Sequence, residues 1–306
     1  MKRLYKNILY FLSPIVALLL FLPTDKYLKY KGLEDDCFQH GQWIHDRLYK
    51  QSKPVDIAFL GSSHTLNGID DQLIEAQLAH HRLSVANFGY CRLGRNLSYV
   101  LLKEILQQKQ LRTLVLEVRE DEDRYSHPIF PYLADTRDVV FAHPLFNKDL
   151  ASDMQTHLSY KVELQQDDWY GPLAKNQRHQ GAFGFSPLQD TAALETLAGN
   201  AKEEEQPDPS SLERRFYMQY PRAYLNKIHQ LCRSNKIQLV FLYLPAYASV
   251  QQKPKEIDRY SSYGTVLIPP KTLLADPDYW FDSEHVNATG AHVLSLWVSQ
   301  QLDGLQ

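Results

Sequence analysis

The amino-acid sequence predicts an α/β fold built around a mostly parallel sheet of five strands. Short apolar runs alternate with amphipathic helical segments along the chain, a pattern that is typical of βαβ units. The first run, residues 55–60, is mainly apolar and stops abruptly at Gly61, as a buried strand does before a tight turn. With 306 residues, the chain is long enough to form a core that needs no covalent cross-links.

Each element of this fold has its own signal in the sequence. Apolar runs predict strands at 55–60, 83–89, 111–118, 236–245 and 264–270, and helical spacing predicts helices within 27–50 and at 69–79, 97–109 and 221–235. The final helix, 287–302, begins at Asn287, a residue that caps helix amino termini well. Its apolar stripe predicts that this helix packs on the sheet.

The alternation breaks between the third and fourth strands. Residues 119–215 are rich in proline and aromatic residues and show no clean period. Long irregular insertions in compact domains are usually functional or disordered. We therefore expect this insertion to form a cap over the strand ends.

Composition excludes several classes of function. A net charge of −3 offers no basic field for a phosphate backbone, so we expect no nucleic-acid partner. Cys37, Cys91 and Cys232 have no metal-ligand spacing and cannot all pair within one chain, and the histidines are scattered, so no metal site is expected. The Gly-Ser-Ser-His-Thr turn lacks a hydroxyl-rich phosphate loop after Thr65, which disfavours FMN, and we expect no cofactor.

The amino terminus has the pattern of a membrane anchor. Lys2, Arg3 and Lys6 precede an apolar stretch at 8–23, which is about the length of a signal sequence core or a short membrane span. No small-residue cleavage site follows directly. The sequence thus predicts an uncleaved signal anchor over 1–26, with 27–306 on the extracytoplasmic side. A buried core helix is the alternative, but residues 8–22 have no polar face.

Polar residues at two places that are far apart in the sequence indicate a catalytic site. Ser62 and Ser63 follow the first strand, where open parallel sheets bind their ligands, although either serine can also simply cap the next helix. A serine nucleophile needs an imidazole within hydrogen-bond reach and usually a carboxylate to orient it. Asp282 and His285, three residues apart before the last helix, supply that pair if the helix packs beside the first strand.

Two of these segments resemble a known family. FLGSSHT, ending the first strand, and FDSEHVNATGAH, before the last helix, together resemble the SGNH (GDSL-like) hydrolase superfamily. They are most similar to its membrane-anchored extracytoplasmic branch, which includes the D-alanyl-transfer protein of teichoic acids and the alginate O-acetyltransferases. The resemblance covers 55–302 without the insertion. It implies a flavodoxin-like three-layer α/β/α sandwich and ester cleavage or transfer through a serine acyl-enzyme.

The resemblance also implies roles for individual residues. Ser63 matches the nucleophile, and Ser62 stands where the family usually has an aspartate, so a helper carboxylate is missing. Gly89 and Gly94 both match the oxyanion-hole glycine. The family's third block, Gly-x-Asn-Asp, is absent. Arg119 is then the candidate replacement donor, or Asp121 occupies that place.

Two further groups near the motifs have alternative interpretations. His64 follows the proposed nucleophile directly, and adjacent residues seldom have suitable geometry for proton transfer, so we expect it only to line the crevice. An acidic cluster begins in the last residues of the third predicted strand and continues beyond it. Its spacing does not match a calcium loop, so we expect an acidic loop paired with Arg119 and Arg124; its members are Glu117, Glu120, Asp121, Glu122 and Asp123.

Together these features predict an anchored enzyme that hydrolyses or transfers an acyl ester on a cell-envelope glycan or related carrier. Ser63 attacks, His285 moves the proton and Asp282 orients His285. The expected partners are an acylated glycan or acyl donor, the membrane, and a membrane protein. The alternative is a catalytically weak scaffold that binds a glycan or a membrane protein during envelope assembly.

Overall fold

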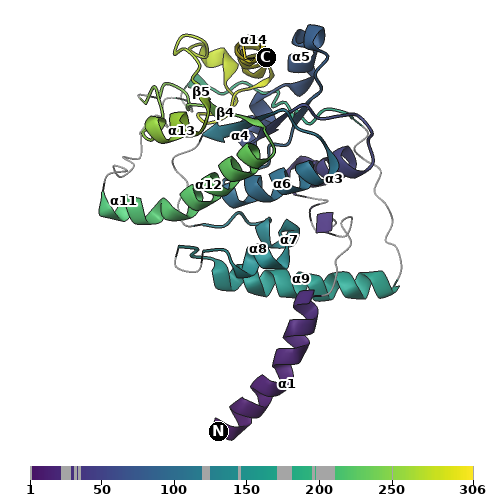
Figure 1. Cartoon of the computed structure of the whole chain (residues 1–306). Helices are drawn as coiled ribbons and strands as arrows, with labels where there is room; N and C mark the ends of the chain where they lie inside the picture. The colour runs from purple at the N-terminus through teal and green to yellow at the C-terminus, as the bar shows by residue number, and fades with distance from the viewer. Residues whose placement is uncertain are drawn as a thin grey trace.

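A computed structural model of the chain describes residues 2–21, 29–30, 33, 36–118, 125–143, 146–170, 181–194, 197, 211–249 and 251–305. Its helices and strands are shown in Figure 1. The strands are β1 (Ile57–Leu60), β2 (Val85–Asn87), β3 (Thr113–Val118), β4 (Gln238–Tyr243) and β5 (Thr265–Leu267). The main helices are α1 (Lys2–Phe21), α3 (His40–Tyr49), α4 (Ser63–Gly68), α5 (Asp71–Gln77), α6 (Arg95–Gln108), α7 (Phe130–Leu133), α8 (Thr136–Val140), α9 (Leu150–Tyr170), α11 (Leu212–Tyr217), α12 (Gln219–Ser234), α13 (Ile257–Tyr263) and α14 (Ala288–Asp303).

The five strands form one sheet in the order β2-β1-β3-β4-β5, and every pair is parallel. The predicted α/β fold is therefore confirmed, and the sheet is wholly rather than mostly parallel. This strand order is that of flavodoxin-like folds. In the register of β1 and β3, Leu60 lies opposite Leu116, so the residues that follow them share one end of the sheet.

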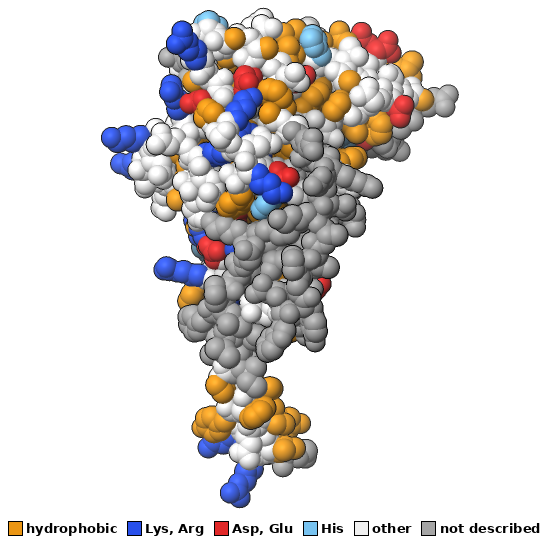
Figure 2. Space-filling view, turned by 90° about the vertical axis from the view of Figure 1, so that its right-hand side faces the viewer, with side chains coloured by type: hydrophobic (Ala, Val, Ile, Leu, Met, Phe, Trp, Pro, Cys, Tyr) orange, Lys and Arg blue, Asp and Glu red, His pale blue; other side chains and the backbone are white. Residues whose placement is uncertain are grey.

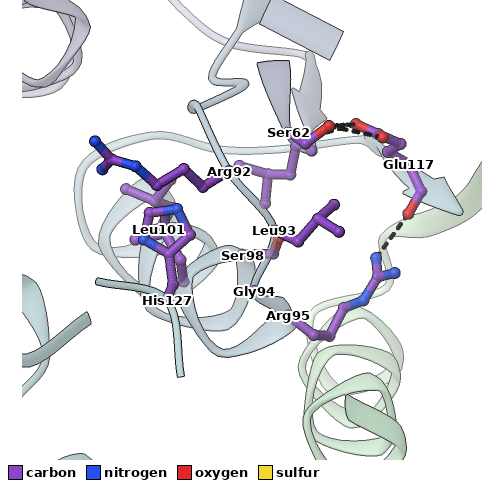
Figure 3. Close-up of a pocket in the computed structure, with 12 residues that line it drawn as sticks. Ser62, Arg92, Leu93, Gly94, Arg95, Ser98, Leu101, Glu117 and His127 are labelled. Carbon is purple, nitrogen blue, oxygen red and sulfur yellow. Dashed lines mark hydrogen bonds between the residues drawn. The ribbon is translucent and has the colours of Figure 1, made fainter. Parts of the chain in front are cut away.

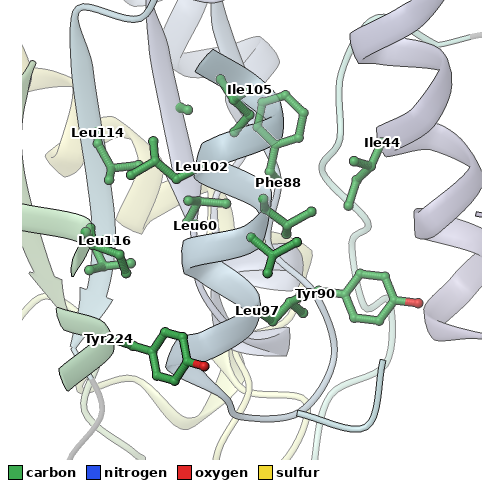
Figure 4. Packing of buried hydrophobic residues seen from close by; sticks show 14 of the residues in the cluster. Ile44, Leu60, Phe88, Tyr90, Leu97, Leu102, Ile105, Leu114, Leu116 and Tyr224 are labelled. Atoms are coloured by element: carbon green, nitrogen blue, oxygen red, sulfur yellow. The ribbon is translucent and has the colours of Figure 1, made fainter. Parts of the chain in front are cut away.

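Alternate residues of the strands face two separate cores. In β1, Ala58 and Leu60 belong to the core beneath α3, α6 and α12, while Ile57 and Phe59 belong to the core beneath α5 and α14. Figure 4 shows the first of these cores, where Leu60 of β1 and Leu114 of β3 lie near Leu102 of α6. Helices thus cover both faces of the sheet, which requires strands that are apolar on both sides.

The predicted elements are present, with differences at their ends. Every strand is shorter than its predicted apolar run, because the residues at the ends of each run belong to the adjoining loops. The helix predicted over 69–79 appears as α5, and a separate short helix, α4, precedes it. Asn287 caps α14 as predicted, since its side chain accepts hydrogen bonds from the backbone N–H groups of Thr289 and Gly290.

The described part of the insertion has two regions. Helices α7, α8 and α9 form a further layer on the side of α6 and α12 (Figure 1). A second region, near residues 181–188, is held by the buried carboxylate of Asp71, which accepts hydrogen bonds from the backbone N–H groups of Gly184, Phe185 and Asn87 at 2.8, 3.1 and 2.9 Å. This part of the insertion is therefore fixed to the core beside β2.

Helix α1 projects away from the rest of the protein (Figure 1). Figure 2 shows orange apolar side chains along it and blue basic groups at its tip. Its exposed large apolar residues are Leu4, Tyr5, Ile8, Tyr10, Phe11 and Leu12. Of the helices in the described ranges, none has the length and apolarity needed to span a membrane.

A disulfide joins Cys37 to Cys91 and leaves Cys232 as a buried thiol. The loop that follows β2 is further tied to the same segment by an ion pair of Arg92 with Asp36, at 2.9 Å, and by a hydrogen bond of 3.1 Å from the Tyr90 hydroxyl to Asp36. These contacts fix the position of the 90–94 loop, which approaches the end of β1.

Candidate active site

The candidate site lies where the chain leaves the adjacent strands β1 and β3. From β1 the chain passes to α5, on one face of the sheet, whereas β3 leads to α12 on the other. Open sheets of this kind have a crevice at such a switch point, outside the carboxyl ends of the strands. Ser62 and Ser63 follow β1, and Glu117 lies near the end of β3.

A sharp turn at Gly61 brings the polar groups of the two strands together. A Cβ atom on Gly61 would lie 2.3 Å from the Glu117 carboxylate and 2.1 Å from the Thr65 hydroxyl. Only glycine fits at this position. This explains why the apolar run ends in glycine: a side chain here would displace the buried carboxylate.

Ser63 and His285 lie within hydrogen-bond distance, although 222 residues separate them in sequence. The distance from Ser63 Oγ to His285 Nε2 is 2.7 Å. Ser63 is the first residue of α4, so its backbone N–H has no acceptor within that helix. The hydroxyl and this N–H therefore belong to one turn at the end of β1, in which Ser63 is half-buried.

Asp282 orients the imidazole of His285. Both carboxylate oxygens lie 3.0 Å from His285 Nδ1, and Oδ1 also accepts hydrogen bonds from the backbone N–H groups of Glu284 and His285. Because a carboxylate only accepts, Nδ1 carries the proton and Nε2 presents its lone pair to Ser63. The three predicted catalytic residues thus form one chain of hydrogen bonds.

The surroundings of His285 favour its neutral form. Burial lowers the pKa of His285 below its usual value of 6.5, and the charge of the neighbouring His64 lowers it further. Asp282 raises this pKa in part, and Glu284 does so more weakly. The net effect is a ring that remains neutral, and able to accept a proton, below pH 6.5.

Glu117 supplies a buried carboxylate next to the proposed nucleophile. It accepts hydrogen bonds from the Ser62 backbone N–H at 2.6 Å, from the Ser62 hydroxyl at 2.9 Å and from the Thr65 hydroxyl at 2.6 Å. The expectation that Glu117 belongs to an acidic loop is wrong, because Glu117 lies within β3 and is only 2% exposed. The sequence feature that could have identified Glu117 as a site residue is its position as a lone acidic residue inside an apolar strand.

His64 does more than line the crevice. Its ring stacks on that of His285, with ring centroids 4.5 Å apart and planes inclined by 17°. Its Nδ1 lies 2.9 Å from Ser62 Oγ, and its Nε2 lies 3.3 Å from a Glu284 carboxylate oxygen. The position of His64 next to Ser63 in the sequence does not predict this stacking, since the stacking depends on where the last helix packs.

Ser62 differs from Ser63 in its environment. Its hydroxyl is buried and bonded to Glu117, and it also accepts a hydrogen bond from the backbone N–H of His64. The hydroxyl of Ser63 instead faces His285. The two serines are therefore not interchangeable: Ser62 caps α4 and fixes the turn, and Ser63 is placed to react.

The two candidate oxyanion glycines lie in different settings. The N–H of Gly89 donates to Asn87 Oδ1 at 2.9 Å, and a Cβ there would lie 2.5 Å from the backbone nitrogen of Leu66. Gly89 thus packs closely against α4, and its N–H is already bonded. Gly94 has φ of +155° and precedes α6, and it lines a small pocket together with Gly61 and Ser62 (Figure 3).

Arg95 is a further residue of this pocket that sequence reasoning did not identify. Its guanidinium donates to the backbone carbonyl of Glu117 at 2.7 Å, which links α6 to the end of β3 (Figure 3). Arg119 and Asp121, the predicted replacements for the missing third block, lie outside the described residues. Among the described residues, Arg95 is the guanidinium that contacts the Glu117 end of β3.

One group of metal-capable side chains occurs within the described ranges. His80, His81 and Asp303 meet at the surface, at the far end of α14 from the candidate site. The Nε2 atoms of the two histidines lie 2.7 and 2.8 Å from the same Asp303 oxygen. Hydrogen bonds of both imidazoles to Asp303 account for this arrangement.

Comparison with known proteins gives distant structural likeness only. No family model and no curated protein matches the chain. Solved structures that resemble it include a GDSL-like lipase from Bacteroides thetaiotaomicron, with 10% identity and a TM-score of 0.40 over 87% of this chain and 98% of that one. A candidate platelet activating factor from Streptococcus pneumoniae has 12% identity and a TM-score of 0.39 over 89% and 94%. A candidate acylhydrolase from Bacteroides fragilis has 10% identity and a TM-score of 0.39 over 85% and 95%.

Proposed function

We propose that this protein is a serine-dependent acyl-ester hydrolase or O-acyltransferase. The observation that carries the proposal is the hydrogen-bonded chain from Ser63 through His285 to Asp282 at the switch point of the sheet. A nucleophile, a neutral base and an orienting carboxylate are the groups that acyl transfer through serine requires. Ser63 lies in the turn that follows β1, whereas Asp282 and His285 share the turn that precedes α14.

The geometry supports a two-step reaction. Ser63 Oγ attacks the ester carbonyl carbon while His285 Nε2 takes the serine proton, and His285 then returns that proton to the departing alcohol oxygen. The acyl group is left on Ser63. Water or an acceptor hydroxyl next gives its proton to His285 Nε2 and attacks the acyl carbon. As the bond to Ser63 Oγ breaks, His285 passes this proton to Oγ, which restores Ser63 and yields an acid or a new ester.

The negative oxygen of each intermediate needs hydrogen-bond donors. The backbone N–H of Ser63, at the first position of α4, is one. We assign the second to the Gly94 loop, because Gly94 lines the same pocket as Gly61 and Ser62 whereas the N–H of Gly89 is already bonded. The Arg119 segment remains a proposed further source of donors.

We further propose that the enzyme acts on an acylated cell-envelope glycan or related carrier outside the cytoplasm, held at the membrane by α1. The exposed apolar residues of α1, with Arg3 and Lys6 near its beginning, support attachment to a membrane surface. The Cys37–Cys91 disulfide supports an oxidising compartment. The proposed partners are the acyl donor, the acceptor glycan and a membrane protein.

Labelling with a fluorophosphonate probe tests the catalytic proposal. The wild-type protein should gain one phosphonyl adduct by intact mass, located on Ser63 by peptide mapping, and Ser63→Ala should gain none. Ser262→Ala is the matched control, because Ser262 is exposed on α13 and should leave labelling unchanged. Equal labelling of wild type and Ser63→Ala would show that the proposal is wrong and would favour the non-catalytic scaffold.

A further inference from the structure

The imidazole of His64 lies face to face with that of His285. The ring centroids are 4.5 Å apart and the planes are inclined by 17°. Two neutral imidazoles gain little from this geometry, but a charged ring at this distance strongly affects the protonation of its neighbour. The protonation of His64 therefore matters for the base of the proposed reaction.

The hydrogen-bond partners of His64 indicate which form it takes. Ser62 has one hydroxyl proton, and it points to Glu117, since a carboxylate can only accept. Ser62 Oγ therefore accepts from His64 Nδ1, 2.9 Å away. The other ring nitrogen, Nε2, lies 3.3 Å from the carboxylate of Glu284, another acceptor. Both ring nitrogens thus face acceptors, an arrangement in which only a doubly protonated ring donates to both.

Glu117 completes the arrangement. Its Oε1 lies 3.8 Å from His64 Nδ1, so His64 lies between two acidic side chains, one buried and one half exposed. Three hydrogen bonds, from the backbone N–H and hydroxyl of Ser62 and the hydroxyl of Thr65, fix the carboxyl group of Glu117 in place. An acidic side chain is thus held next to His64 by the same turn that presents Ser63.

We propose that His64 is a positioning residue for the reaction: its positive ring, held between Ser62, Glu117 and Glu284, supports His285 and keeps that base neutral in acidic surroundings. This inference rests on the proposed function. It assigns a regulatory role to the second histidine, and it predicts an enzyme that stays active below the pH at which an ordinary histidine becomes protonated.

The charges around His285 are consistent with this role. Among the described residues, the titratable groups facing it are His64 from α4 and Asp282 and Glu284 from its own turn, with Glu117 of β3 behind His64. The two acidic groups on the turn favour the protonated base, whereas burial and His64 oppose it and lower the pKa of His285 overall. His64 is the one cation in this group.

The test measures the titration of His285 directly, by NMR of the histidine ring Cε1–Hε1 signals in the full chain. The signal of His285 is assigned by its loss in His285→Gln. In wild type its midpoint should lie below pH 6.5. In His64→Phe, which keeps a flat ring against His285 without the charge, the midpoint should rise by about one unit. His80→Asn, at the far end of α14, should leave it unchanged.

Kinetics separate the charge of His64 from its packing. With an ester substrate, kcat/KM of His64→Phe should be about tenfold lower than wild type on the acidic side and equal to it on the alkaline plateau. A role in packing alone would lower kcat/KM at every pH. An unchanged His285 midpoint in His64→Phe would overturn the inference. Lack of Ser63 labelling in wild type would instead overturn the proposed function. The two failures are distinguishable, because the NMR titration of His285 does not require catalytic turnover.

Discussion

The hydroxyl of Ser62 and the carboxylate of Glu117 are joined across two neighbouring strands, at 2.9 Å from Oγ to Oε1. A second hydrogen bond, from the Ser62 backbone N–H to Oε2 at 2.6 Å, makes this contact bidentate. The turn that carries Ser63 is therefore fixed to β3 and not only to its own strand. The sequence suggests that a helper carboxylate is missing after Gly61, and β3 supplies one from another direction.

Replacing Glu117 should therefore disturb both stability and reactivity. Glu117→Ala leaves three donors, on Ser62 and Thr65, without their acceptor in a buried place. We expect the free energy of unfolding to fall by about 3 kcal/mol, and phosphonate labelling of Ser63 to slow. Urea denaturation measures the first effect. Glu117→Gln, which keeps one acceptor oxygen, should lose less, and equal losses for the two variants would contradict this explanation.

Asp282 should act on the rate rather than on binding. In Asp282→Asn the side-chain oxygen still accepts from the backbone N–H groups of Glu284 and His285, so the turn keeps its shape. The charge that stabilises protonated His285 is lost, however. We expect kcat to fall by about 10²–10⁴-fold with little change in KM. A KM effect without a kcat effect, in steady-state assays, would argue that Asp282 only shapes the site.

The Cys37–Cys91 disulfide should stabilise the loop that carries Gly94. Replacing both cysteines by serine should lower the free energy of unfolding by about 2–4 kcal/mol, because the unfolded chain regains freedom. Thermal melts with and without a thiol reductant provide the control. The reductant should lower the Tm of wild type and leave that of the double variant unchanged. If the reductant lowered the Tm of both proteins, its effect on wild type would not come from the Cys37–Cys91 disulfide.

Asp71 should make stability depend on pH. Burial raises the pKa of Asp71 to about 6, although three backbone N–H groups oppose the shift. The folded protein therefore holds this proton when the unfolded chain has already lost it, so stability falls as pH rises from about 4 to about 6. The difference from the ordinary value of 3.8 corresponds to about 3 kcal/mol.

Asp71→Asn removes that titration. Other carboxyl groups also affect unfolding, so the informative quantity is the stability of the variant minus that of wild type. This difference should increase by about 3 kcal/mol between pH 4 and pH 7, measured by denaturant unfolding at each pH. A difference that stays constant with pH would contradict the raised pKa of Asp71.

Local patterns in the sequence determined much of this protein. Apolar runs located all five strands, and Asn287 marked the start of α14, because burial and capping act over a few neighbouring residues. The spacing of Asp282 and His285 likewise predicted a side-chain pair, which the structure contains. The proximity of Ser63 and His285 was also anticipated, on the condition that the last helix packs beside the first strand.

Other features depended on contacts between distant segments. The sheet order places β3 directly beside β1, although β2 comes between them in sequence, and this alone brings Glu117 to Ser62. The packing of α14 likewise decided that His64 would stack on His285. The Cys37–Cys91 pairing and the bonded N–H of Gly89 arose in the same way. Such contacts between distant residues depend on the free energy of the whole packed core, so no local sequence pattern predicts them.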